Sequence, residues 1–143
     1  EPYYRQLTRT YDVKIVFNQT YDLLKHSYAA LVTSGTATLE TGLMGVPQVV
    51  CYKGSRISYI FARELIKVPF ISLVNLIMKR EVLKELIQER LTETRLTYEL
   101  KTLLDDDALR NRIIFSYEIM RERLGGKGAS ARTAQLMIQY LKH

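Results

Sequence analysis

Apolar runs four or five residues long recur through the first half of the chain, and stretches of mixed polarity separate them. Runs of that length, bounded by polar turns and rich in β-branched residues, are typical of buried strands. We expect strands at 13–17, 29–33, 48–52 and 70–73. We expect helices between them at 22–26, 36–44 and 56–67. Thr20 and Ser55 are the candidate N-caps of the first and third helices.

The second half of the chain has the apolar spacing of amphipathic helices. We expect helices at 81–88, 95–104, 105–124 and 130–140. Thr92 and Ser130 are placed to cap two of them, and the acidic run 105–107 lies where a helix dipole favours negative charge. Strands that alternate with helices, followed by helices alone, predict an α/β fold with a parallel sheet and a helical C-terminal tail.

Composition narrows the class of protein. The chain has 143 residues, of which 47% are hydrophobic and 25% are charged, so we expect one globular domain over residues 1–143. The single cysteine, Cys51, excludes a disulfide framework and a thiolate zinc site. The two histidines are too few and too far apart for a histidine-rich metal site. A reducing compartment is the simplest interpretation.

The net charge of +6, from 21 basic and 15 acidic residues, does not indicate a nucleic-acid partner. Basic and acidic side chains are interleaved, as on solvated helix faces, whereas a nucleic-acid patch is more one-sided. The longest nearly apolar stretch, 68–78, is far shorter than the roughly 20 residues of a membrane-spanning helix. The chain starts at Glu1 without a leader-like pattern, and we expect it to be a piece of a longer protein.

The segment 33–40 carries the most informative chemistry, because a predicted strand turns there into a predicted helix. Ligands of parallel sheets bind beyond the carboxyl ends of the strands, and the free amides of a helix N-terminus suit a phosphate. Ser34, Gly35 and Thr36 would form that N-terminus. Glu40, one turn on and on the same face, could accept hydrogen bonds from a ribose diol. These features fit a nucleoside diphosphate; the alternative is that Ser34 and Thr36 cap the helix and Glu40 is solvated.

Two pairs of runs resemble known enzymes. A resemblance to the donor-nucleotide half of GT-B glycosyltransferases is carried by 34–40 (SGTATLE) and 45–53 (GVPQVVCYK). With the addition of 70–77 (FISLVNLI) and 80–88 (REVLKELIQ), the chain is similar to the lipid-A-disaccharide synthases, a bacterial family. The resemblance begins at about residue 13 and implies one Rossmann-like half of a GT-B enzyme.

That resemblance implies an activity for the parent enzyme. It would transfer 2,3-diacylglucosamine from UDP-2,3-diacylglucosamine to a lipid acceptor, 2,3-diacylglucosamine 1-phosphate, and release UDP. Ser34, Gly35 and Thr36 would hold the diphosphate and Glu40 the ribose, with no metal and no other cofactor. The acceptor site and the general base are expected in an N-terminal half that this chain lacks, so no catalytic residue is expected here. The implied location is cytoplasmic, peripheral at the inner membrane of a Gram-negative bacterium.

Further candidate contacts come from the same motifs and from one helix. Asn75 and Gln88 occupy motif positions near the sugar-nucleotide cleft, with capping as the alternative. Lys53 follows a predicted strand and could point toward the phosphate. A basic and aromatic stripe on the helix at 56–67 would suit anionic lipid at a membrane surface, the alternative being an ordinary amphipathic helix docked on the sheet. The stripe consists of Arg56, Tyr59, Arg63 and Lys67.

Other functions and one assembly stay open. Half of another UDP-GlcNAc-using enzyme, such as the lipid II glycosyltransferase or an epimerase, would share the 34–40 turn, although the 70–88 pattern argues against it. A non-catalytic module that binds a phosphorylated partner or a polyanion has only the net charge in its favour. Leu136, Met137 and Tyr140 of the last helix would be exposed without an N-terminal half, which favours a homodimer or a domain swap.

Overall fold

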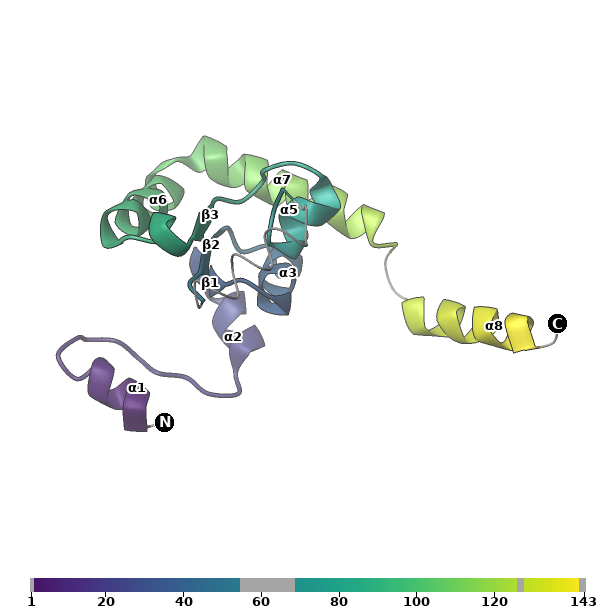
Figure 1. The fold of residues 1–143 in the computed structure, drawn as a ribbon, viewed down its shortest axis with the longest axis horizontal. Helices are drawn as coiled ribbons and strands as arrows, with labels where there is room; N and C mark the ends of the chain where they lie inside the picture. The colour runs from purple at the N-terminus through teal and green to yellow at the C-terminus, as the bar shows by residue number, and fades with distance from the viewer. Residues whose placement is uncertain (1, 55–68, 126–127, 142–143) are drawn as a thin grey trace.

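The computed structural model describes residues 2–54, 69–125 and 128–141 (Figure 1). Its strands are β1 Ala30–Thr33, β2 Gln48–Tyr52 and β3 Glu85–Ile87. Its helices are α1 Pro2–Leu7, α2 Thr20–Lys25, α3 Thr36–Leu43, α5 Leu73–Met78, the 3-10 turn η1 Gln88–Arg90, α6 Glu93–Asp105, α7 Asp107–Arg123 and α8 Ala129–Leu141.

The three strands form one parallel sheet in the order β1-β2-β3. Thr33 pairs with Cys51, and Cys51 pairs with Leu86, so the carboxyl ends of all three strands lie along one edge. The middle strand is the most buried, and Val49 and Val50 are 1% and 0% exposed. The predicted α/β fold with a Rossmann-like parallel sheet is confirmed.

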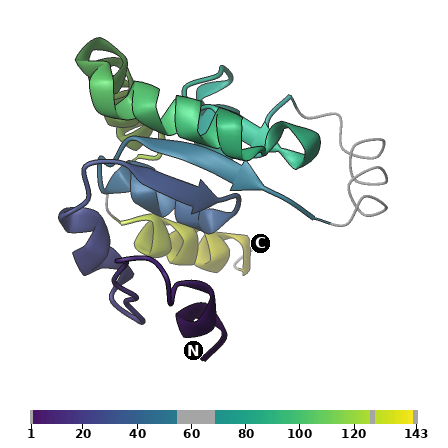
Figure 2. The same ribbon diagram turned by 90° about the vertical axis from the view of Figure 1, so that its left-hand side faces the viewer.

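Helices cover both faces of this sheet (Figures 1 and 2). The helices α3 and α5 pack together on one face, and α6 lies against β2 on the other. Apolar side chains fill the space between the layers, which is the arrangement a parallel sheet requires. The core consists of Val49, Val50, Val74, Met78, Leu83, Leu86, Leu103, Ile113, Tyr117 and Met120.

The long helix α7 closes the amino edge of the sheet. Arg121 donates to the Leu43 carbonyl at the end of α3 (2.7 Å), and Arg123 donates to the Ile77 carbonyl near the end of α5 (3.1 Å). The last carbonyls of a helix have no hydrogen-bond partner within the helix and carry the negative end of its dipole. The two guanidinium groups therefore stabilise the helix ends both by hydrogen bonding and by their positive charge.

One buried hydrogen-bond network ties α7 to the rest of the fold. The Tyr117 hydroxyl donates to the Val46 carbonyl (3.1 Å) and accepts from Gln48 Nε2 (3.2 Å). Gln48 Nε2 also donates to the Thr38 carbonyl in α3 (2.9 Å). Gly42 permits this approach, because a Cβ there would lie 3.1 Å from the Tyr117 ring. Burial raises the pKa of Tyr117 far above its ordinary value, although the Gln48 hydrogen bond lowers it slightly, so the hydroxyl stays a donor.

The N-terminal segment up to residue 19 lies apart from the sheet (Figure 1). The strand predicted at 13–17 is wrong: this stretch pairs with no strand among the described residues. A strand is stabilised by its neighbour, so a β-branched run without a partner stays irregular. The segment exposes the large apolar side chains Tyr3, Tyr4, Leu7, Tyr11, Val13, Val16 and Phe17.

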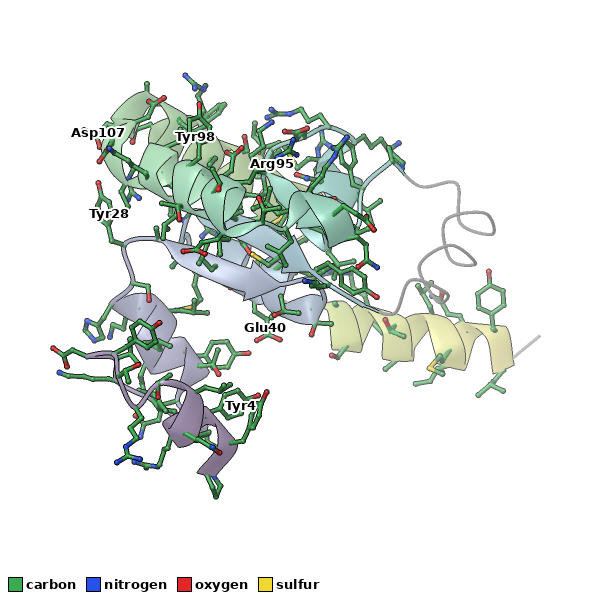
Figure 3. The ribbon with its side chains drawn as sticks, turned by 60° about the vertical axis from the view of Figure 1, so that its left-hand side comes forward. Tyr4, Tyr28, Glu40, Arg95, Tyr98 and Asp107 are labelled. Atoms are coloured by element: carbon green, nitrogen blue, oxygen red, sulfur yellow. The ribbon has the colours of Figure 1, made fainter. Side chains whose placement is uncertain are left out.

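A contact at Tyr28 anchors the chain where it enters β1. The Arg110 guanidinium lies 3.4 Å from the centre of the Tyr28 ring and donates to the Tyr28 carbonyl at 2.8 Å. Figure 3 shows Tyr28 next to the start of α7. A stacked guanidinium that also donates a hydrogen bond holds both the ring and the backbone.

Two further predictions of secondary structure are wrong. The segment 70–73 is a turn, not a strand, and Ser72 caps α5 by accepting from the Asn75 amide (3.3 Å). The segment 81–88 is a loop followed by β3, not a helix. Its apolar spacing is helical, but residues 85–87 complete a ladder with β2, and that tertiary pairing overrides the local periodicity.

The other elements predicted within the described residues are confirmed to within a few residues. Thr92 caps α6 by accepting from the Arg95 amide, and Asp106 caps α7 by accepting from the Leu109 amide. Thr20 and Ser130, predicted as caps, instead lie inside α2 and α8. The predicted helix 56–67 lies outside the described residues, as do its candidate lipid contacts Arg56, Tyr59, Arg63 and Lys67.

The last helix, α8, projects from the body of the chain (Figure 1) and buries none of its residues. Met137 and Tyr140 are 64% and 81% exposed, in agreement with the exposure expected for this helix. Within the described ranges, no helix combines the length and the apolar character that crossing a membrane requires.

We predict that Tyr117→Phe lowers the free energy of unfolding by about 1–2 kcal/mol, because it removes the donor to the buried Val46 carbonyl. Chemical denaturation measures the change. Tyr98→Phe is the matched control, since Tyr98 is 67% exposed and should change stability by less than about 0.5 kcal/mol. Equal effects of the two substitutions would contradict the network.

We also predict that the difference in stability between the unsubstituted chain and Tyr117→Phe depends on pH. The unfolded phenol ionises near about pH 10, whereas the raised pKa of Tyr117 keeps the folded phenol neutral. The stability that the neutral phenol supplies is therefore complete below about pH 10 and is lost as the pH rises further. The advantage of the unsubstituted chain over Tyr117→Phe should shrink above about pH 10 in urea denaturation, and an advantage that grows there would be inconsistent with burial.

Candidate functional site

The carboxyl edge of the sheet brings together three segments that are distant in the sequence. Ser34 follows β1, Lys53 and Gly54 follow β2, and Gln88 follows β3. The Ser34 amide donates to the Cys51 carbonyl (2.9 Å), which fixes the first segment against the second. Ligands of open α/β sheets bind at this edge, so the structure places the predicted residues where such a site belongs.

The start of α3 is open. Its N-cap residue, Gly35, has φ +149° and ψ −163°, a conformation that a side chain disfavours, and no side chain caps the helix. A Cβ on Gly35 would meet no atom within 4 Å, so there is free space beside the backbone. The Ser34 hydroxyl donates instead to the Ile71 carbonyl (3.2 Å), and Thr36 is exposed. The alternative interpretation, that Ser34 and Thr36 cap this helix, is wrong.

Glu40 lies on the solvent side of the same helix, as its spacing from Thr36 predicts. The opposite side of α3, with Thr38, Thr41 and Gly42, is buried. Glu40 is half-buried, and Figure 3 shows its side chain directed away from the sheet. Its carboxylate makes no hydrogen bond or ion pair to any described residue, so its acceptor oxygens are available to a ligand.

Gln88 combines backbone strain with an unsatisfied polar group. Its φ of +50° is unusual for a residue with a side chain, and such strain costs on the order of 1–3 kcal/mol. The side chain is 7% exposed, and its Oε1 accepts from the Gly54 amide (3.3 Å). Its buried Nε2 has no partner among the described residues. A buried donor without an acceptor is costly, and strain of this kind clusters at ligand sites.

Asn75 is buried, and its amide group is fully used by the protein. Its Oδ1 accepts from the amides of Val82 and Leu83 (2.8 and 2.9 Å). Its Nδ2 donates to the Leu83 carbonyl (2.9 Å) and to Glu85 Oε1 (2.8 Å). A side-chain amide has no further hydrogen-bonding capacity of consequence. Asn75 therefore holds the loop before β3, and it has no free group to offer a ligand.

Glu85 is a residue that the sequence analysis missed. Its Oε2 accepts from the Ile71 amide (2.9 Å). Its Oε1 accepts from the Ser72 amide (3.0 Å), the Ser72 hydroxyl (2.7 Å) and Asn75 Nδ2 (2.8 Å). A partly buried carboxylate with four protein donors organises the backbone around it. The sequence offers one signal for this role, an acidic residue within the largely apolar run 82–87. The periodicity of that run predicts a helix, and an acidic residue on the solvent face of a helix is too common to indicate a special role.

The remaining candidates are less informative. Lys53 is exposed, and burial raises the pKa of the Cys51 thiol, which keeps it protonated. One hollow of about 390 Å³ lies between β3 and α6, and a second of about 440 Å³ lies among β2, α6 and α7. They share Glu81, Lys84, Tyr98 and Glu99, and neither includes the α3 turn. No three His, Cys, Asp or Glu side chains in the described part of the chain lie together as metal ligands would.

A parallel sheet whose carboxyl edge carries the glycine-led start of a helix defines a Rossmann-like α/β domain. The family profile described as lipid-A-disaccharide synthetase matches residues 4–138. The chain belongs to this family of glycosyltransferases of lipid A biosynthesis.

Curated relatives agree with the family. The chain is similar to the lipid-A-disaccharide synthase of Anaeromyxobacter dehalogenans (strain 2CP-C), with 40% identity over 94% of this chain and 35% of the relative. It is similar to the lipid-A-disaccharide synthase of Syntrophus aciditrophicus (strain SB), with 38% identity over 91% of this chain and 34% of the relative. The chain thus spans about a third of the length of these relatives.

We predict that Asn75→Asp lowers the free energy of unfolding by at least about 3 kcal/mol. The new carboxylate would face the Glu85 carboxylate and the Leu83 carbonyl, both of which now accept from Asn75 Nδ2. Asn111→Asp makes the same chemical change at an exposed position of α7 and should be nearly neutral. Thermal and urea denaturation compare the two variants, and similar small losses would contradict the role given to Asn75.

Proposed function

We propose that this chain binds the UDP part of a nucleotide-sugar donor at the carboxyl edge of its sheet. The observation that carries the proposal is the open start of α3, where the first amides have no side-chain cap and Gly35 leaves space beside them. A diphosphate would accept from these amides and lie at the positive end of the helix dipole. Membership of the lipid-A-disaccharide synthetase family favours a nucleotide sugar over other anions.

Each remaining group at the edge has a part in this proposal. The Glu40 carboxylate would accept two hydrogen bonds from the ribose diol, one helical turn from the diphosphate. Gln88 Nε2 would find in the donor the acceptor that it lacks in the protein. Lys53, exposed after β2, would add positive charge near the phosphates. The Ser34 hydroxyl is already engaged, so the backbone amides that follow it would make the phosphate contacts.

We propose further that the parent enzyme transfers 2,3-diacylglucosamine from UDP-2,3-diacylglucosamine to 2,3-diacylglucosamine 1-phosphate. In that reaction the glycosidic bond to UDP breaks, the acceptor hydroxyl forms the new bond, and a general base from another part of the parent takes the hydroxyl proton. Negative charge develops on the leaving diphosphate. The amides of α3 would stabilise it electrostatically, which requires no metal ion.

The exposed apolar surface suggests partners for this chain. The far C-terminal helix α8 and the N-terminal segment expose Met137, Tyr140 and Tyr11, which a folded parent would cover. We propose that the N-terminal half of the parent, or a second copy of this chain, packs there. Since donor and acceptor would both carry acyl chains, the parent would work at the cytoplasmic surface of the inner membrane as a peripheral protein.

We predict that the chain binds UDP, and that Glu40→Gln weakens binding about tenfold or more, because the charge-assisted hydrogen bonds to the ribose are lost. Isothermal titration calorimetry with UDP measures this, with free phosphate as a ligand that lacks the ribose and should not respond to the substitution. Glu118→Gln, exposed on α7 away from the carboxyl edge, is the matched control and should bind UDP normally. A folded chain that does not prefer UDP over phosphate, or an unaffected Glu40→Gln, would contradict the proposal.

A further inference from the structure

Ile71 links two parts of the carboxyl edge through the two peptide groups that flank it. The Ile71 amide donates to Glu85 Oε2 (2.9 Å), and the Ile71 carbonyl accepts from the Ser34 hydroxyl (3.2 Å). Ser34 immediately precedes Gly35, whose backbone opens α3. A chain of two hydrogen bonds therefore runs from a carboxylate at the start of β3 to the turn that would face the diphosphate.

The Glu85 site demands a carboxylate and not merely a polar side chain. Four donors point at its two oxygens: the amides of Ile71 and Ser72, the Ser72 hydroxyl and Asn75 Nδ2. An ionised carboxylate is an acceptor only, with about four lone-pair sites, so it can satisfy all four. A glutamine could keep its carbonyl oxygen among the three donors at Oε1, but its NH2 group would then face the Ile71 amide, donor against donor.

Three contacts hold the turn among the described residues. The Ser34 amide donates to the Cys51 carbonyl, which holds the backbone to β2. Thr38 donates from its hydroxyl to the Gly35 carbonyl (2.8 Å), and the Ser34 hydroxyl donates to the Ile71 carbonyl, while no side chain caps the first amides of α3. The position of the Ile71 carbonyl therefore bears on where the amides of Gly35 and Thr36 point. A displacement of about 1 Å at such a site is enough to weaken ligand binding strongly.

We propose that Glu85 is a positioning residue of the donor site: its carboxylate holds the peptide groups on both sides of Ile71 through the Ile71 and Ser72 amides, and the Ile71 carbonyl in turn holds Ser34 and the start of α3. Glu85 touches no ligand in this arrangement. Its effect on nucleotide binding passes through Ile71 and Ser34, and this part of the inference rests on the proposed function. The coupling between Glu85 and the turn is independent of any ligand.

The first test uses amide hydrogen exchange by NMR on the unliganded chain. In Glu85→Gln, exchange at Ile71 and at the hydrogen-bonded amides of Ser34 and Thr38 is expected to accelerate about tenfold or more relative to core amides such as Val49 and Val50. Glu81→Gln is the matched control, because Glu81 is exposed in the loop that leads into β3. Acceleration shared equally by the core would indicate global destabilisation only and overturn the proposal, as would unchanged exchange at Ser34 and Thr38.

The second test is a double-substitution cycle on UDP affinity. Glu85→Gln and Ser34→Ala should each weaken UDP binding, and the double variant should bind no more weakly than the worse single variant, because both changes break one chain of contacts. Additive losses, or unchanged affinity in Glu85→Gln, would overturn the positioning role.

Absence of UDP binding by the unsubstituted chain would instead contradict the proposed function, while the exchange experiment would still decide whether Glu85 holds the turn. If Glu85→Gln does not fold, Ser34→Ala alone must accelerate exchange at the amides of position 34 and Thr38 but not at Val49 for the coupling to stand.

Discussion

The segments just before and just after α5 have no regular structure of their own, and two side chains supply the hydrogen bonds that their backbone would otherwise lack. Asn75 satisfies three backbone groups of Val82 and Leu83, and Glu85 satisfies the amides of Ile71 and Ser72. Buried backbone groups that lose their partners are expensive, so these contacts decide whether β3 can join the sheet. Without β3 in place, Gln88 and the carboxyl edge would have no defined position.

The two edges of the sheet are treated differently by the chain. At the amino edge, α7 satisfies carbonyls at the ends of α3 and α5 through Arg121 and Arg123 and buries Tyr117 against Val46. At the carboxyl edge, α3 has no cap and Gln88 Nε2 has no partner among the described residues. Gln48 Oε1, at the amino edge, is also buried without a partner among the described residues, so the difference between the edges lies in the uncapped start of α3.

Local signals in the sequence were sufficient for the turn at 33–36 and its strand, because a short apolar run that ends at Ser34-Gly35 encodes both without distant partners. The same holds for the predicted cap at Thr92. Long-range interactions explain the failures. The run 13–17 has strand composition but no neighbour, and residues 85–87 have helical spacing but pair with β2. The saturation of Asn75 and the role of Glu85 depend on backbone atoms up to fourteen positions away, which no pattern of residue types reveals.

A ¹H–¹⁵N NMR titration of the chain with UDP tests whether the amides at the start of α3 bind the diphosphate of a nucleotide, as we propose. We expect the largest shift changes at the backbone amides of Gly35, Thr36 and Ala37 and at the Gln88 side-chain amide. Shift changes confined to the hollow between β3 and α6, at Arg90, Arg95 and Tyr98, would contradict this proposal, because the nucleotide would then bind at the wrong side of the sheet.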